Sequence, residues 1–554
     1  MGRYLNPGSS MFDQTTKARL YVDKTEMITC LNAVVMTPDK YVCVSRPRRF
    51  GKTYAADMVS AYYDRTAHSE GLFSELKLAG TAPVKNGYGL LAWDAYLGKF
   101  DVIRLVMTRF FKDDIPFEKG FSMMQKLVVR ELKRSYPDAD YFDEDDLVLS
   151  VGDAYDASGR QFVFVIDEWD AIFRAGGYGA ADQRRYVYFL RDLLKDKEYV
   201  ALAYMTGILP IKKYSDDSAL NMFWEYTMME PGELAPYTGF TEGEVKALCR
   251  DRHRDFAQMK EWYDGYEVRG NVPAISFKEG GPKPEAPRYS IYCPLSVAKA
   301  VTTGDISNWW YRSVASDTLK GYITRDFDGL KEAVALLMDG GRLKIQTSTY
   351  ANDLDNLGSA DDVLTLLVHL GYLAFDWETS EVRIPNREIM GVFNESTEGA
   401  EWKEVLDSLE ASKELLEATW AMDAERVAAL LEEAHDRAGN LTYNDEAALA
   451  YAVRSAYYAA EAYYTVIPEL DSGKGYADIA FLPQPEHADR PALVVELKHG
   501  RDADTALSQI RSRNHPARLR HYANNMLLVG VNYDKEVPAG EAGYKHHTCV
   551  IERA

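Results

Sequence analysis

The chain has 554 residues, of which 46% are hydrophobic and 12% aromatic, so it holds enough apolar material for several cores and is not a mainly disordered chain. Its 64 Lys and Arg against 85 Asp and Glu leave a net charge of −21, which argues against a protein that coats nucleic acid, because phosphate binding needs basic surfaces. The five cysteines are scattered without a C-x-x-C pair, so neither a disulfide framework nor a zinc ribbon is indicated.

Short apolar runs alternate with helical patterns over the first 236 residues. Because near-continuous hydrophobic runs are typical of strands buried on both faces, this alternation predicts an α/β domain with a parallel sheet. The predicted strands are 41–44, 101–107, 161–166 and 199–205, and the predicted helices include 53–63, 122–134 and 181–194.

The pattern changes after residue 236. Residues 237–394 favour a mainly helical, lid-like domain, with a helix at 361–370, a Pro/Gly loop at 280–287 and a capping box formed by Thr241 and Glu244. Residues 395–440 are helical and acidic, with 13 acidic and 3 basic side chains between 395 and 436. We interpret this segment as a linker with a solvated face.

Residues 441–554 predict a second α/β domain. A helix at 444–458 precedes strands near 464–467, 477–482 and 492–498, and a basic helix starts at Thr505. No run of about 18 apolar residues predicts a membrane span, and no signal peptide is recognisable, so we expect a cytoplasmic protein that does not contact membranes. His546, His547 and Cys549 lie close together, but without a second ligand cluster a metal site there is disfavoured.

The loop between the first strand and its helix is the first functional signal. Gly51, Lys52 and Thr53 provide the end of a phosphate-binding loop, in which a lysine reaches the phosphates and a hydroxyl holds Mg²⁺. Arg46 stands where the first glycine is usual, so the motif alone is degenerate. The context strengthens it, because Arg46, Arg48, Arg49 and Lys52 place four positive charges within seven residues.

The third predicted strand ends in two acidic residues. Asp167 is expected to coordinate Mg²⁺ and Glu168 to activate water, because ligands bind at the carboxyl edge of such sheets. Asp170 could share either role, and capping of the next helix is the structural alternative. Thr206 ends the fourth strand, where it is expected to sense the γ-phosphate unless it only terminates the strand.

Two carboxylates and a lysine point to a second site. Residues two apart on a strand share a face, so Glu496 and Lys498 point the same way, and a hairpin brings Asp478 beside them. This group suits a Mg²⁺ site whose lysine activates water or stabilises charge on a phosphate. The structural alternative is an ordinary ion pair on an edge strand. Residues 498–522 carry a net charge of +4, which suits a phosphodiester backbone but also a solvated helix face.

Six motifs occur in an order that resembles the bacterial AAA-ATPase-like family with a C-terminal PD-(D/E)XK nuclease-like domain. They are Tyr21-Val-Asp-Lys-Thr25, the loop Arg46 to Thr53, Ile166-Asp-Glu-Trp-Asp170, Thr206-Gly-Ile-Leu209, Gly239-Phe-Thr-Glu242 and Glu261-Trp-Tyr-Asp-Gly-Tyr266. The resemblance continues through Ile384-Pro-Asn-Arg-Glu388 to nearly the C-terminus. In that family an arginine is normal at the position of Arg46, whereas Trp169 replaces the usual tyrosine.

The resemblance also implies further residues of the second site. Glu446 would complete the metal shell, with Glu461 and Glu469 as alternatives, and Gln509 matches the residue on the following helix. The family commonly has Gly-Arg-x-Asp at the first acid, whereas this chain has Gly475-Tyr-Ala-Asp478 and therefore lacks the arginine, and whether nearby Lys474 replaces it is left open.

The predicted function is ATP binding and hydrolysis coupled to a Mg²⁺-dependent nuclease that acts on DNA or RNA, with Mn²⁺ as an alternative metal. Family analogy adds defence against foreign nucleic acid, and ATPases of this kind often assemble as homo-oligomers. The first alternative is a nucleotide-gated switch whose nuclease-like domain binds nucleic acid or protein without cleavage. The second is a protein that binds ATP but never hydrolyses it.

Overall fold

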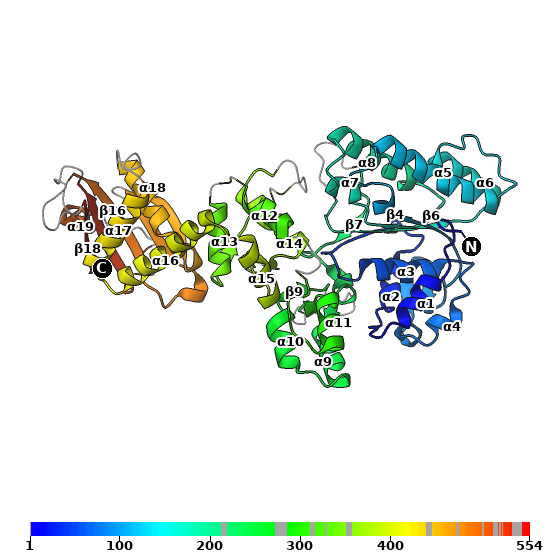
Figure 1. The fold of residues 1–554 in the computed structure, drawn as a ribbon, viewed down its shortest axis with the longest axis horizontal. Helices are drawn as coiled ribbons and strands as arrows, with labels where there is room; N and C mark the ends of the chain where they lie inside the picture. The colour runs from blue at the N-terminus through cyan, green and yellow to red at the C-terminus, as the bar shows by residue number, and fades with distance from the viewer. Residues whose placement is uncertain are drawn as a thin grey trace. The chain divides into compact units, whose positions relative to one another are not determined.

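The computed structural model describes residues 2–211, 219–271, 285–310, 316–325, 327, 329–348, 350, 357–438, 446–471, 476–500, 503–512, 519, 522, 524–534 and 546–554. The chain divides into two compact units, one of residues 1–318 and 344–392 and the other of residues 319–343 and 393–554. Figure 1 labels their helices and strands. Within the described part, none of the helices has the length and apolar character needed to cross a membrane.

A five-stranded parallel sheet forms the centre of the first unit. Its order is β4-β5-β6-β1-β7, with β1 (Tyr41–Ser45), β4 (Asp101–Val106), β5 (Phe162–Asp167), β6 (Val200–Gly207) and β7 (Trp224–Tyr226). Each neighbouring pair is parallel, which confirms the predicted α/β fold. The sequence predicts the four longer strands at nearly the same bounds. It misses β7, whose Trp-Glu-Tyr sequence contains no apolar run.

Alternate residues of these strands contribute side chains to two separate hydrophobic cores, one on each face of the sheet. Ile103 and Phe164 contribute to one core, and Val102 and Val163 to the other. Figure 1 shows the first face covered by α5, α6, α7 and α8 and the second by α1, α2, α3 and α4. Their bounds are α1 (Ser10–Thr16), α2 (Met27–Val34), α3 (Lys52–Tyr63), α4 (Glu70–Phe73), α5 (Phe117–Ser135), α6 (Leu147–Ser158), α7 (Ala171–Arg174) and α8 (Ala180–Leu194). Smaller elements are η1 (Lys77–Gly80), β2 (Val84–Asn86), β3 (Gly89–Leu91) and η2 (Met107–Arg109).

The region after residue 236 is mainly helical, as predicted. The capping box of Thr241 and Glu244 is present at the start of α9, and the helix predicted at 361–370 is α14. Residues 280–284 of the predicted Pro/Gly loop lie outside the described residues. The elements are η3 (Gly232–Tyr237), β8 (Phe240–Thr241), α9 (Glu242–Asp251), α10 (Phe256–Tyr263), β9 (Tyr266–Arg269), β10 (Arg288–Tyr292), α11 (Pro294–Thr303), α12 (Ser316–Ile323), α13 (Leu330–Met338), β11 (Leu343–Lys344), α14 (Ala360–Leu370), β12 (Ala374–Asp376), β13 (Glu381–Arg383) and α15 (Arg387–Ser396).

The second unit contains a mixed five-stranded sheet of order β14-β15-β16-β17-β18. β16 and β17 are parallel, and the other neighbouring pairs are antiparallel. This arrangement confirms the predicted restriction-endonuclease-like α/β fold. The elements are α16 (Ala400–Trp420), α17 (Ala424–Ala438), α18 (Glu446–Ala456), η7 (Tyr458–Ala462), β14 (Tyr464–Asp471), β15 (Tyr476–Pro483), η8 (Pro485–His487), β16 (Ala492–His499), α19 (Ala503–Ser512), β17 (Met526–Tyr533) and β18 (His547–Arg553).

Helices cover both faces of this sheet. Leu416 of α16 and Val427 of α17 share a core with Val495 of β16, so the acidic segment interpreted as a linker supplies part of this core. On the other face, α19 lies so close to β17 that a Cβ on Gly530 would come within 2.6 Å of the Ala503 carbonyl oxygen. Glycine is therefore required at position 530 for this close approach.

Candidate functional site

The carboxyl ends of three parallel strands meet beside the loop that follows β1. β6 lies between β1 and β5, so Thr206 of β6 is brought next to Asp167 at the end of β5. The Thr206 hydroxyl donates a hydrogen bond of 2.5 Å to Asp167 Oδ1, and both side chains are buried. This is the sheet edge at which the sequence predicts a nucleotide.

The loop itself folds around Lys52. Gly51 precedes α3 with a φ of 84°, a left-handed conformation that favours glycine. Lys52 Nζ donates hydrogen bonds to the carbonyl oxygens of Arg46 at 2.9 Å and Pro47 at 2.8 Å. Burial lowers the pKa of Lys52, while Glu168 is the largest of the carboxylate influences that oppose this shift. The ammonium group thus already lies across the loop, where phosphate oxygens could replace the two carbonyls.

The three arginines of the loop differ in their surroundings. Arg46 is only 2% exposed, and its Nη1 donates to the carbonyl oxygens of Ser45 at 3.0 Å and Tyr226 at 2.8 Å. Burial lowers the pKa of Arg46 to about 9. By contrast, Arg48 is exposed and Arg49 half-buried. The structure therefore uses Arg46 to tie the loop to β7 and leaves the other two nearer the surface.

Asp167 and Thr53 fit a divalent cation. Asp167 is 1% exposed, and its Oδ2 makes no hydrogen bond among the described residues. Arg104 Nη2 lies 3.7 Å from that oxygen. The same nitrogen forms an ion pair with Asp57 Oδ1 at 2.7 Å, and Asp57 follows Thr53 by four residues on α3. A buried carboxylate oxygen without a hydrogen bond and an exposed hydroxyl are oxygen ligands of the kind that Mg²⁺ prefers.

Glu168 and Asp170 are both held by Arg174, a residue that the sequence analysis missed. Arg174 forms an ion pair with Glu168 through Nη2 and with Asp170 through Nε at 3.1 Å. Asp170 also accepts the backbone N–H groups of Ile208 and Leu209, each at 2.9 Å, which commits it to structure. Asp170 and Arg174 stand four residues apart, a spacing typical of helical ion pairs and the one signal that could have identified Arg174.

Residues from the mainly helical region pack directly on the phosphate-binding loop. The ring of Phe50 lies 5.7 Å from the ring of Tyr266 and 6.2 Å from that of Trp310. Buried Glu388 holds the Trp310 backbone, accepting its N–H at 2.8 Å and the Ser296 hydroxyl at 2.8 Å. This buried carboxylate connects the helical region to the loop.

We expect His369 and Glu388 to give opposite pH dependences. Burial, and secondarily Arg46, lower the pKa of His369 to about 3, so its contribution to stability is present above pH 6.5 and is lost as the pH falls. Burial raises the pKa of Glu388 to about 7, so its contribution is present below pH 4.5 and is lost as the pH rises through 7.

Urea unfolding at several pH values checks both signs. Between pH 6.5 and 5, the unfolding free energy of wild type should fall relative to His369→Gln by about 1.4 kcal/mol per pH unit. Relative to Glu388→Gln, it should instead rise as the pH falls from 7 to 5. A constant difference across this range would contradict the assignment for the residue concerned.

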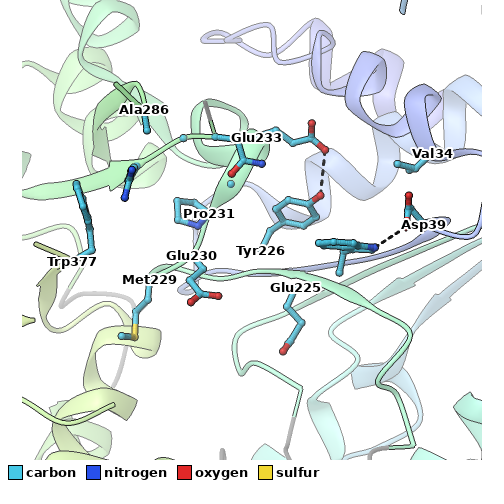
Figure 2. Close-up of a pocket in the computed structure, with 15 residues that line it drawn as sticks. Val34, Asp39, Glu225, Tyr226, Met229, Glu230, Pro231, Glu233, Ala286 and Trp377 are labelled. Carbon is cyan, nitrogen blue, oxygen red and sulfur yellow. Dashed lines mark hydrogen bonds between the residues drawn. The ribbon is translucent and has the colours of Figure 1, made fainter. Parts of the chain in front are cut away.

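A cavity of about 800 Å³ is lined in part by the residues of β7 (Figure 2). Tyr226 donates to Glu233 Oε1 at 3.2 Å, and Trp224 Nε1 donates to Asp39 Oδ1 at 3.1 Å. The charged residues that line the cavity are Asp39, Glu225, Glu230, Glu233 and Arg269. Four carboxylates against one guanidinium disfavour phosphates, so the loop at Lys52, rather than this cavity, is the candidate phosphate site.

In the second unit, Asp478, Glu496 and Lys498 come together. β15 and β16 pair with Ile479 opposite Val495, and Asp478 Oδ2 accepts the Leu497 N–H at 2.7 Å. Lys498 Nζ donates to Glu496 Oε1 at 3.1 Å and to the Leu497 carbonyl oxygen at 2.9 Å. The Glu496 and Lys498 side chains are 1% and 7% exposed, and β16 is an internal strand. β16 is therefore not an edge strand, but the ion pair of the structural alternative is present, in a buried position where charges require partners.

The helices that carry Glu446 and Gln509 lie on opposite faces of this sheet. α19, which contains Gln509, packs through Leu507 on the face of Val494, the face that Glu496 and Lys498 share. α18, which begins at Glu446, packs through Leu449 on the face of Val495. The side chains of Glu446, Gln509 and Glu469 lie outside the described part, as do Lys474, Arg501, Arg513, Arg518 and Arg520.

His546 and His547 attach the start of β18 to α17 through hydrogen bonds with Glu432. Glu432 of α17 accepts the backbone N–H groups of both and hydrogen-bonds the Nδ1 atoms of both, at distances of 2.8 to 3.0 Å. Among the residues that the structure describes, no group of three or more His, Cys, Asp or Glu side chains is arranged to hold a metal ion.

Two family models match separate parts of this chain. Residues 8–215 match the family model described as a predicted AAA-ATPase, and residues 445–538 match that of the PD-(D/E)XK nuclease superfamily. Similar solved structures include a Walker-type ATPase of Pyrococcus abyssi (11% identity, 67% of this chain and 94% of that chain, TM-score 0.33) and Cdc6p of Pyrobaculum aerophilum (11% identity, 69% and 93%, TM-score 0.26). A search of curated proteins found no match. The two family matches confirm the architecture that the sequence motifs predict.

Proposed function

We propose that this chain, which joins a predicted AAA-ATPase domain to a PD-(D/E)XK nuclease superfamily domain, binds and hydrolyses ATP and uses the nucleotide state to control a metal-dependent nuclease. The observation that carries the proposal is the group of Asp478, Glu496 and Lys498, because burial of the Glu496 and Lys498 charges on an internal strand is costly without a function. The ordered loop around Lys52 supports the nucleotide part.

At the first site, each residue has a role that its surroundings allow. Lys52 exchanges the Arg46 and Pro47 carbonyl oxygens for phosphate oxygens. Thr53 and Asp167 would hold Mg²⁺, and this ion would neutralise charge on the phosphates. Glu168 orients the attacking water and accepts its proton as the bond between the γ-phosphorus and the ADP oxygen breaks.

At the second site, Asp478 and Glu496 would hold Mg²⁺ or Mn²⁺, and this ion would polarise the scissile phosphate. Lys498 lies within hydrogen-bond distance of Glu496 and so places a positive charge beside the metal ligands. There it stabilises the charge that develops on the phosphate as water attacks phosphorus and the P–O bond to the leaving nucleoside breaks.

The proposed domain bounds, location, assembly and biological role are expectations from the sequence. The domain bounds 1–236, 237–394, 395–440 and 441–554 stay a prediction, with α16 and α17 contributing to the core of the second unit. We also propose a cytoplasmic location, as the sequence predicts, and, by analogy with the family, assembly into homo-oligomers and a role in defence against foreign nucleic acid.

A second candidate function keeps both folds without cleavage. The position two residues before Asp478 holds Tyr476, where the nuclease family commonly has an arginine. A nuclease-like domain that lacks this cation could bind nucleic acid or protein as a nucleotide-gated switch.

A substrate panel separates the two candidates. The purified chain is incubated with single- and double-stranded DNA and RNA in Mg²⁺ or Mn²⁺, with and without ATP. We expect metal-dependent cleavage of at least one substrate, at a rate that ATP changes. Binding that responds to ATP while every substrate stays intact would reject the nuclease and support the switch.

A further inference from the structure

Arg174 ends the short helix α7 and lies among the acidic residues of the candidate nucleotide site. Its side chain is 16% exposed and forms ion pairs with Glu168 and Asp170. Burial is the main cause that lowers the pKa of Lys52, the neighbouring carboxylates oppose this shift, and the charge of Arg174 adds to it. A second cation thus stands within electrostatic range of the lysine that binds the phosphates.

The two carboxylates that Arg174 contacts are held very differently. Asp170 is fully buried and anchored by the N–H groups of Ile208 and Leu209, so it cannot move without breaking those bonds. The Glu168 side chain is 22% exposed, and its backbone has a φ of 56°, in the left-handed region that non-glycine residues rarely adopt. The fixed partner is therefore Asp170, and the exchangeable partner is Glu168.

The contact with Glu168 has a consequence for hydrolysis. A carboxylate oxygen that already accepts a hydrogen bond from a guanidinium is not free to receive the proton of an attacking water. Glu168 is the residue that the proposed mechanism uses for that proton. The ion pair with Arg174 therefore occupies the carboxylate that the proposed mechanism uses as the base.

We propose that Arg174 is a γ-phosphate-binding arginine supplied from within the same chain, and that it releases Glu168 when ATP binds. A guanidinium has five donors in a planar fork, so Nε can stay on Asp170 Oδ2 while Nη2, which also donates to Asp170 Oδ1 at 3.3 Å, exchanges Glu168 for a phosphate oxygen. This step is an exchange of ion-pair partners in which no covalent bond forms or breaks. The inference rests on the proposed ATPase function and adds the residue that senses the third phosphate.

The test compares the affinities for ATP and ADP in Mg²⁺, measured by isothermal titration calorimetry. In Arg174→Gln the affinity for ATP should fall at least about tenfold, and that for ADP less than about threefold, because only ATP offers the γ-phosphate. Arg174→Lys should recover part of the loss. The matched control is Arg185→Gln, which removes an exposed arginine paired with Glu118 on α5.

A second variant keeps the proposal falsifiable if Arg174→Gln folds poorly. Glu168→Gln weakens the ion pair, so it should tighten ATP binding, and this tightening should disappear in the Glu168→Gln, Arg174→Gln double variant. The inference is overturned if Arg174→Gln loses ATP and ADP affinity equally. It is also overturned if Glu168→Gln tightens ATP binding to the same extent with Arg174 present and in the Arg174→Gln background, because Arg174 would then have only a structural role. If wild type binds neither nucleotide, it is the proposed ATPase function that fails.

Discussion

Replacing Lys498 by methionine should reduce metal-dependent cleavage at least about 100-fold. Methionine has similar length and suits a side chain that is only 7% exposed, but it removes the positive charge beside Glu496. Removing a group that stabilises developing charge or transfers a proton typically costs two to four orders of magnitude. The measurement is the initial rate of cleavage of the best substrate from the panel, in Mg²⁺ and in Mn²⁺.

The control for this substitution is Lys403→Met, which removes an exposed lysine from α16 of the same unit. Thermal unfolding of both variants shows whether Lys498→Met still folds, since a buried pair is broken. Asp478→Asn, at a partly exposed position, should lose cleavage as well. Wild-type cleavage in a folded Lys498→Met protein would remove the nuclease assignment of this site.

Replacing Glu168 by glutamine should stop ATP hydrolysis while ATP still binds. The amide can keep a hydrogen bond to water but cannot accept its proton, so we expect the steady-state rate of phosphate release to fall at least about 100-fold. The phosphate contacts of Lys52 and the metal contacts of Asp167 remain, and the weaker ion pair with Arg174 should tighten ATP binding, so binding should persist. Phosphate release and ATP affinity are measured on the same preparation.

Glu75→Gln is the matched control, because Glu75 is an exposed glutamate of the same unit. It should leave both phosphate release and ATP affinity unchanged. An unaltered hydrolysis rate in Glu168→Gln would exclude Glu168 as the base. If wild type binds ATP but releases no phosphate, the protein is one that senses ATP without hydrolysing it.

The charge pattern of the sequence helped to identify the residues of the two candidate sites. It was a poorer guide to the structure of the acidic segment between them. The net charge of −21 averages over a basic loop at Arg46 to Lys52 and an acidic segment at 395–436. From the sequence, the acidic segment is interpreted as a solvated linker, because charged residues dominate its composition. In the structure, Leu416 and Val427 from the same segment reach the core beside Val495, since an amphipathic helix exposes its charges on one face and buries the other.

The sequence by itself determined the strand pattern, the order of the two domains and the two sets of chemical groups around Lys52 and Lys498, because these depend on residues that are close along the chain. Only the tertiary structure decided that Arg46 is buried against Tyr226, that Arg174 holds Glu168 and that Glu388 supports Trp310 against Phe50. Hydrophobic periodicity shows which face of an element is buried, but not which distant segment covers it. The partners of a buried charge are therefore set by packing, and packing also determines which of the predicted side chains meet.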